Sequence, residues 1–162
     1  MIDQDGYREN VGIVLLNSNN QVFWGRRIGE KAWQFPQGGI QDNEDIEQAM
    51  YRELNEELGL LQEHVQVIAR TVNWIYYDVP GLLNRANSSN SNNLYRGQKQ
   101  IWYLLKFIGH DFQINIKKYK HPEFDAWRWV DYWLPVNQVV HFKRHVYKKA
   151  LKELFDLGKL NV

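Results

Sequence analysis

Three glutamates, Glu53, Glu56 and Glu57, recur at spacings of three and four residues in a segment with helical character. Side chains at positions i, i+3 and i+4 lie on one face of a helix, so the three carboxylates converge. Like charges at this spacing repel, and burying them is costly unless a cation compensates. Carboxylate oxygens suit hard cations, and Mg²⁺ prefers a few carboxylates together with substrate phosphates. The spacing therefore indicates a site for Mg²⁺ or Mn²⁺; the alternative is an acidic helix end that is exposed to water.

The apolar residues of the same segment bear on that choice. Ile46, Ala49 and Met50 form the stripe that a helix would bury, and on a helical wheel Glu53 and Glu57 continue it. A solvated acidic face would place the carboxylates opposite this stripe. The pattern therefore favours carboxylates that face the body of the protein.

We expect this helix to run from about Glu44 to Leu58. Its acidic first turn suits the helix dipole, with Asn43 or Asp42 as the N-cap. Gly59 stands where a left-handed C-terminal cap is typical. A second amphipathic helix is expected over Phe142–Leu157.

Runs of β-branched and aromatic residues predict the strands that must carry the rest of the site. These runs are Asn10–Leu16, Gln21–Gly25, Trp33–Phe35, Val65–Asp78, Lys99–Gly109 and Trp127–Trp133. The first two are separated by Asn17–Asn20 and read as a hairpin. Ser and Asn fill eight of the ten positions over 84–93, which predicts a loop. With no repeat or linker, the 162 residues predict a single mixed α/β domain in which helices flank a sheet.

Composition narrows the possible chemistry further. The chain has no cysteine, which excludes disulfides, thiolate zinc sites and a cysteine nucleophile. It has no apolar run long enough to cross a membrane, and its acidic start lacks the layout of a signal peptide, so we expect a cytoplasmic protein. Residues 1–80 hold 6 Lys/Arg and 13 Asp/Glu, whereas residues 81–162 hold 14 and 6. This asymmetry indicates metals on one side and polyanions on the other, or chance placement of surface charge.

The segment Gly38–Leu60 resembles the signature of the Nudix hydrolase family at all nine positions that the signature defines. The matching residues are Gly38, Glu44, Arg52, Glu53, Leu54, Glu56, Glu57, Gly59 and Leu60. The resemblance implies a Nudix fold, a mixed β-sheet sandwiched between helices. It also implies an enzyme that uses divalent metals, Mg²⁺ or Mn²⁺, to hydrolyse a nucleoside diphosphate linked to a variable group.

The same resemblance assigns roles to individual residues. It assigns metal binding to Gly38, Glu53, Glu56, Glu57 and Glu123. It assigns catalytic or supporting roles to Glu53, Glu57, Glu123, Arg52 and Glu44. It assigns substrate binding to Arg8, Arg27, Gln98, Lys99, Val140, Phe142 and Lys143. Arg8 would clamp phosphate, Gln98 and Lys99 would face the same cleft, and the remaining four would surround a base beside the phosphates.

Further blocks resemble one branch of the family, the RNA pyrophosphohydrolases and their dinucleoside polyphosphate hydrolase relatives. These blocks include Trp33–Gly39, Gly97–Gln100 and Pro122–Asp125. The branch implies removal of pyrophosphate or successive phosphates from the 5′ end of RNA, leaving a monophosphate and promoting RNA decay. We expect a monomer that acts without a membrane; a protein activator leaves no trace in the sequence.

Two other functions compete with this one. Tyr76 and Tyr77 follow the signature at about the distance where diadenosine polyphosphate hydrolases carry a tyrosine, so the sequence does not separate that substrate from RNA. A non-catalytic RNA-binding module, with the acidic helix only structural, is the alternative from another class.

Overall fold

The computed structural model describes residues 1–80 and 95–161. The loop that the sequence predicts over 84–93 lies outside these residues. Within the described part of the chain, no helix is long and apolar enough to cross a membrane.

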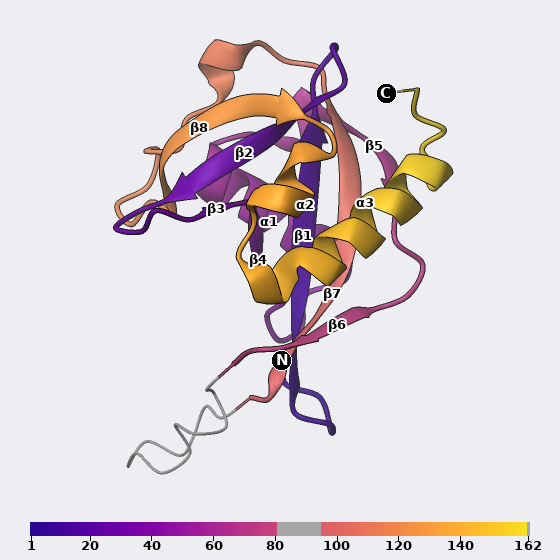
Figure 1. The fold of residues 1–162 in the computed structure, drawn as a ribbon. Coiled ribbons are helices and arrows are strands. Elements are labelled where there is room, and N and C mark those ends of the chain that lie inside the picture. The colour runs from indigo at the N-terminus through magenta and orange to yellow at the C-terminus, as the bar shows by residue number, and fades with distance from the viewer. Residues whose placement is uncertain (81–94, 162) are drawn as a thin grey trace.

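The described residues form an eight-stranded mixed sheet around two long central strands, β1 and β7 (Figure 1). Strands β1 and β7 run parallel, with Tyr7 opposite Gly97 and Leu16 opposite Lys106. On the other side of β1, strands β2 and β4 pair with it antiparallel, while β5 and β6 pair with β7 and β3 and β8 with β2. The strand bounds are β1 Tyr7–Leu16, β2 Gln21–Arg27, β3 Trp33–Gln34, β4 Gln37–Gly39, β5 Val65–Arg70, β6 Ile75–Asp78, β7 Gly97–Phe107 and β8 Phe124–Asp131.

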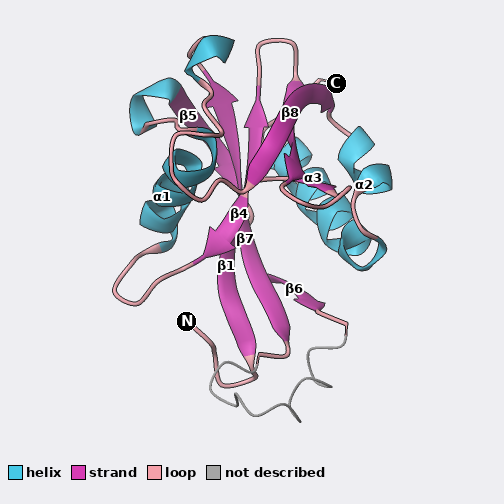
Figure 2. Cartoon of the chain, turned by 90° about the vertical axis from the view of Figure 1, so that its left-hand side faces the viewer, coloured by secondary structure: helices cyan, strands magenta, loops and turns pink. Residues whose placement is uncertain are grey.

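Helices cover both faces of this sheet (Figure 2). Helix α1 (Ile46–Leu58) lies on one side, and α2 (Leu134–Gln138) and α3 (Arg144–Leu157) lie on the other. Short 3₁₀ turns occur at Gln62–His64, Asp111–Gln113 and His141–Lys143. The predicted fold class, a mixed sheet between helices, is confirmed.

Strand β1 shows how the sequence produces this arrangement. Alternate side chains of a strand point to opposite faces of its sheet. Val11, Ile13 and Leu15 accordingly pack into the core that contains α1, whereas Val14 and Leu16 pack into the core under α3. Burial on both faces explains why this strand is a nearly continuous apolar run rather than an alternating one.

Helix α1 begins later than its acidic first turn indicates. The N-cap is Asp45, whose carboxylate accepts a hydrogen bond from the backbone N–H of Gln48 at 2.7 Å, while the Gln48 side chain accepts one from the Asp45 backbone. The prediction of Asn43 or Asp42 as cap is wrong, because Asn43 has a left-handed backbone (φ 64°) in the turn before the helix. The predicted C-cap is confirmed: Gly59 has φ 70° and donates to Asn55 O.

Three other boundaries also differ from the prediction. The strand expected over Val65–Asp78 is two strands, β5 and β6, with residues 71–74 between them; the Thr71 backbone N–H still donates to Trp102 O, but its hydroxyl accepts the Trp102 N–H in place of a backbone carbonyl. The last strand ends at Asp131, after which the short helix α2 begins with Pro135 in its first turn. The final helix starts at Arg144, after a 3₁₀ turn.

Candidate active site

Helix α1 presents its glutamates to the sheet as the helical wheel predicts. Glu53 and Glu57 are 8% and 6% exposed, whereas about half of the Glu56 side chain is exposed. Ala49 and Met50, one turn earlier on the same stripe, are fully buried. The carboxylates of Glu53 and Glu57 are therefore held at the edge of the core. We call Glu53, Glu56 and Glu57 the acidic cluster.

The backbone of β4 lies directly against this cluster. A Cβ atom added to Gly38 would lie 1.9 Å from the Glu53 carboxyl carbon, far inside van der Waals contact. Gln37, the residue before it, donates its backbone N–H to Glu57 Oε2 at 3.3 Å. A side chain at position 38 would force the Glu53 carboxylate to move, whereas glycine leaves the backbone of β4 open to whatever the carboxylates bind.

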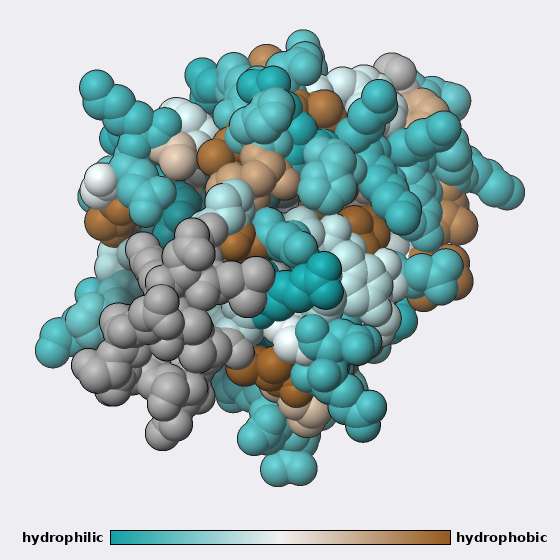
Figure 3. Space-filling view, turned by 60° about the horizontal axis from the view of Figure 1, so that its bottom comes forward, coloured by the Kyte–Doolittle hydropathy of each residue, from teal (hydrophilic) through white to brown (hydrophobic). Residues whose placement is uncertain are grey.

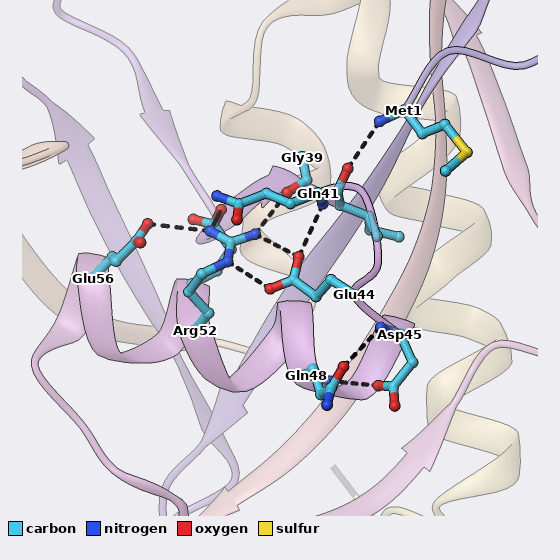
Figure 4. A network of polar contacts seen from close by, with 10 residues as sticks. Met1, Gly39, Gln41, Glu44, Asp45, Gln48, Arg52 and Glu56 are labelled. Carbon is cyan, nitrogen blue, oxygen red and sulfur yellow. Dashed lines mark hydrogen bonds and ion pairs between the residues drawn. The ribbon is translucent and has the colours of Figure 1, made fainter.

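Arg52 holds the acidic residues in place by donating five hydrogen bonds (Figure 4). Its guanidinium contacts Glu44 through Nε at 2.6 Å and Nη2 at 3.0 Å, and Nη2 also donates to Gly39 O at 2.8 Å. Its Nη1 donates to Glu53 at 2.7 Å and to Glu56 at 3.3 Å. The hydrogen bond from Arg52 lowers the pKa of Glu44. The predicted supporting pair is therefore formed in the structure.

The charges of this cluster are unbalanced. Burial raises the pKa of Glu53 to about 7, although Arg52 opposes the shift. Burial, with the nearby charges of Glu53 and Glu123, raises the pKa of Glu57 well above its usual range. Buried carboxylates of this kind need a positive partner. Arg52 is shared among Glu53, Glu44 and Glu56, so its single charge does not balance theirs.

The donor set fits a hard divalent cation in that role, because it consists of carboxylate oxygens beside an open strand backbone. Among the described residues, no three acidic or histidine side chains converge as a ready-made ligand set. Arg52 pairs with one oxygen of Glu53 and one of Glu56. A bound cation would compete with Arg52 for Glu56, the more exposed of the two carboxylates.

Glu123 reaches the same region from a segment far along the chain. It precedes β8, and its backbone carbonyl accepts a hydrogen bond from the Ile28 N–H at 3.0 Å. Its carboxylate lies 3.3 Å from Arg27 Nε and 3.5 Å from Gln34 Nε2. It lines one cavity together with Gln37, whose backbone N–H contacts Glu57, and its charge contributes to the raised pKa of Glu57.

A cavity of about 270 Å³ adjoins Glu123 and contains four of the predicted substrate residues. Its lining is Arg27, Gln34, Gln37, Tyr77, Val79, Tyr95, Gln98, Glu123, Phe142 and Lys143. Residues of β6, the start of β7 and the turn before α3 contribute to this lining. Figure 3, in which the bottom of Figure 1 is turned forward, shows a described surface that is mostly hydrophilic with small apolar patches.

The aromatic and cationic groups of this cavity lie close together. The rings of Phe142 and Tyr77 are 6.2 Å apart, and the Lys143 ammonium is 5.8 Å from the Tyr77 ring. Burial and the neighbouring charge of Arg27 lower the pKa of Lys143 to about 8. Aromatic faces beside cations suit a nucleobase and its phosphates. Gln34 and Gln37 were not assigned by the sequence, although they stand in the Trp33–Gly39 block that carries the resemblance.

Three predicted substrate residues lie elsewhere. Lys99 follows Gln98 in β7 and so points to the opposite face, where its ammonium is 2.9 Å from Asp3 and 3.4 Å from Glu9. The expectation that Gln98 and Lys99 share one cleft is therefore wrong. Val140 is 45% exposed and does not line the cavity.

Arg8 is the third predicted substrate residue outside this cavity. A Cβ on Gly39 would come within 2.6 Å of the Arg8 guanidinium, which places Arg8 beside the loop that Arg52 also contacts. With Met1, Ile2 and Tyr95, Arg8 lines a second cavity of about 320 Å³. Because Tyr95 lines both cavities, the two are neighbours.

This fold, with an acidic helix facing a glycine-containing strand, matches a known protein family. A model of the NUDIX domain matches residues 6–155, and the chain belongs to the Nudix family. Nudix hydrolases generally use divalent metals, and membership supports hydrolysis of a phosphoanhydride bond as the activity.

Solved structures with the same fold come from several organisms. The E. coli dihydroneopterin triphosphate pyrophosphohydrolase superposes with a TM-score of 0.66 at 17% identity, covering 88% of this chain and 95% of that one. A C. elegans Ap4A hydrolase binary complex gives 0.63 at 15% identity, covering 88% and 93%. A MutT protein from Methanosarcina mazei gives 0.57 at 14% identity, covering 91% and 94%. At these identities the likeness concerns the fold.

Proposed function

We propose that this protein is a metal-dependent pyrophosphohydrolase that converts the 5′ triphosphate or diphosphate end of RNA to a monophosphate. The observation that carries the proposal is the adjacency of two sites through one residue. Gln37 lines the cavity that holds Arg27 and Lys143 and donates its backbone N–H to Glu57 at 3.3 Å; Glu123 lines the same cavity, and its charge contributes to the raised pKa of Glu57. A nucleobase in the cavity would therefore place its phosphates toward the α1 carboxylates.

The acidic cluster supplies the residues that would hold the metal. Glu53, Glu56 and Glu57, with the backbone at Gly38 and Glu123 from the later loop, would bind Mg²⁺, with Mn²⁺ as a substitute. When bound, the cations neutralise charge on the phosphates and make a bound water more acidic. This is the chemistry that the buried carboxylates alone do not provide.

The protein's own groups orient the reactants. Arg52 fixes the Glu53 carboxylate, while Arg8 offsets negative charge on the phosphates. Water attacks phosphorus, a phosphate or pyrophosphate leaves, and one of Glu53, Glu57 or Glu123 accepts the proton of the water. The chain has no cysteine, and no serine lies in a nucleophile-elbow context, which supports direct attack by water over a covalent intermediate.

A dinucleoside polyphosphate is the second candidate substrate. Its support is Tyr77, which lines the cavity of about 270 Å³ that would hold the base, called the base cavity below. The Tyr77 hydroxyl donates a hydrogen bond to Gln98 Oε1 at 2.7 Å. That ring would stack on an adenine as readily as on a base of RNA, because stacking is tolerant of base identity.

A side-by-side assay separates the substrates. Purified protein with Mg²⁺ is given 5′-triphosphorylated RNA and diadenosine tetraphosphate at equal concentrations, and the products are resolved by chromatography. The proposal expects monophosphorylated RNA and pyrophosphate, or two phosphates, as the main products. Rapid turnover of the dinucleotide with inert RNA would overturn the RNA assignment.

Glu57→Gln separates an enzyme from a binding module. The variant should bind RNA but lose turnover by about 10³-fold or more, since a charged ligand of the cation becomes a neutral amide. Glu47→Gln is the matched control, because Glu47 is an exposed residue of the same helix. Unchanged turnover in Glu57→Gln would contradict the metal assignment.

A further inference from the structure

A groove beside the acidic cluster has no role in the function proposed above. It has a volume of about 400 Å³ and lies between α1 and the segment before β8. Its lining residues are Arg52, Asn55, Glu56, Tyr119, Lys120 and His121. Two of these, Arg52 and Glu56, also belong to the network that holds the catalytic carboxylates. The groove therefore begins where the acidic cluster ends.

The segment on its far side is strongly basic. Residues 117–121 read Lys-Lys-Tyr-Lys-His, and all five are exposed. Among the described residues, none of the three lysines or His121 forms an ion pair with an acidic side chain. The Lys118 ammonium instead lies over the aromatic ring of Tyr119, 5.5 Å from the ring centroid. Positive charge is thus left available next to an acidic site.

This basic segment is anchored to the helix. The Asn115 N–H donates to Leu58 O at 2.8 Å, and the Tyr119 hydroxyl donates to Asn55 Oδ1. Gly59 permits the approach, because a Cβ there would lie 2.8 Å from Asn115 O. Lys120 and His121 are consequently held at the groove by the same helix that carries the carboxylates.

The α1 carboxylates lie between the groove and the base cavity: Arg52 and Glu56 line the groove, whereas Gln37, which lines the base cavity, donates its backbone N–H to Glu57 at 3.3 Å. His121 lines the groove, and Glu123, two residues later, lines the base cavity. A substrate with its base in the base cavity and its reacting phosphate at the carboxylates would therefore extend from the carboxylates toward the groove. The part of the substrate that lies beyond the reacting phosphorus is the leaving pyrophosphate.

We propose that this groove binds the terminal phosphates of the substrate, with Lys120 and His121 donating hydrogen bonds to the leaving pyrophosphate. The inference rests on the proposed function for the identity of the substrate. The acidic residue that faces the groove, Glu56, is already paired with Arg52 at 3.3 Å, so its charge is partly matched. Lysine and histidine donors near a metal-bound polyphosphate stabilise charge on the group that leaves.

Binding of pyrophosphate, measured without any turnover, tests the groove directly. Isothermal titration of wild type and Lys120→Gln with magnesium pyrophosphate should show affinity reduced about 5- to 10-fold in the variant, as expected for one charge-assisted contact. Lys120→Arg should retain most of the affinity. Lys149→Gln, which removes the same charge from an exposed position on α3, should bind like wild type. Equal affinity in wild type and Lys120→Gln would overturn the proposal.

Product inhibition distinguishes terminal phosphates from the RNA backbone. If the groove holds the leaving group, Lys120→Gln weakens inhibition by pyrophosphate and leaves inhibition by 5′-monophosphorylated RNA unchanged. The reverse result would show that the basic segment contacts the RNA backbone, which contradicts the proposal. Because the titration needs no turnover, Lys120-dependent pyrophosphate binding in a protein that is inert toward RNA would refute the proposed substrate and leave the groove standing.

Discussion

Replacing Glu53 by Gln should stabilise the metal-free protein at alkaline pH, although it removes an ion pair. Burial raises the pKa of Glu53 from 4.5 to about 7. A carboxyl group whose pKa is higher in the folded state binds more protons when folded, so the free energy of unfolding falls as the pH rises between these values. A shift of about 2.5 pKa units corresponds to about 3 kcal/mol, which is fully lost above pH 7.

The variant should recover most of that free energy. Its amide oxygen can still accept from Arg52 Nη1, and the attraction between Arg52 and the charged carboxylate is already included in the net pKa shift. The expected gain at pH 8 is therefore about 3 kcal/mol, or roughly 6–12 °C in Tm for a chain of this size. At pH 4.5 or below, where Glu53 is protonated in the folded protein, the gain should vanish.

Urea denaturation in EDTA at pH 8 and pH 4.5, followed by tryptophan fluorescence, measures this difference. Glu47→Gln, exposed on the same helix, should change the free energy of unfolding little at either pH. A Glu53→Gln variant that is less stable than wild type at pH 8 would show that pairing with Arg52 outweighs burial, and the electrostatic reasoning would be refuted.

Three other perturbations have defined outcomes. Mg²⁺ or Mn²⁺ should raise the Tm of wild type at pH 8 in differential scanning calorimetry and have a much smaller effect on Glu57→Gln; equal shifts would contradict the site. Gly38→Ala should lower kcat by about 10²-fold in the RNA assay, because the new methyl group collides with the Glu53 carboxyl; near-normal kcat would be incompatible with that contact. The KM for RNA should rise as the pH increases through about 8, where the Lys143 ammonium loses its proton, and Lys143→Arg should remove that dependence; a flat wild-type profile would exclude Lys143 from phosphate or base binding.

The acidic helix was predictable because its pattern is local. The positions of Glu53 and Glu57 on the stripe of Ile46, Ala49 and Met50 require only helical periodicity, and burial of the first two confirms the prediction. The C-cap at Gly59 is equally predictable, because a left-handed cap depends on the backbone of the cap residue itself.

Errors arose where two local signals competed. The Asp45 cap carries a capping box with Gln48, a spacing visible in the sequence, but neighbouring acids at 42 and 44 suggested an earlier start. The resemblance predicts that Lys99 faces the cleft, although the alternation of side chains along β7 separates it from Gln98.

The groove beside α1 could not be read from the sequence. It depends on Tyr119 meeting Asn55 and on Asn115 meeting Leu58, contacts between segments about 60 residues apart. The local sequence shows only a basic run, which is typical of any solvated surface. Packing of the late segment against the helix gives that run its position next to Arg52 and Glu56.

The central claim is that the α1 carboxylates bind divalent cations, and anomalous diffraction from crystals soaked in Mn²⁺ tests it most directly. We expect an anomalous peak in contact with Glu53, Glu56 or Glu57 and near the backbone of Gly38, with the Arg52–Glu56 contact lengthened. No peak at this cluster at millimolar Mn²⁺, or a peak only at other surface acids, would contradict the claim.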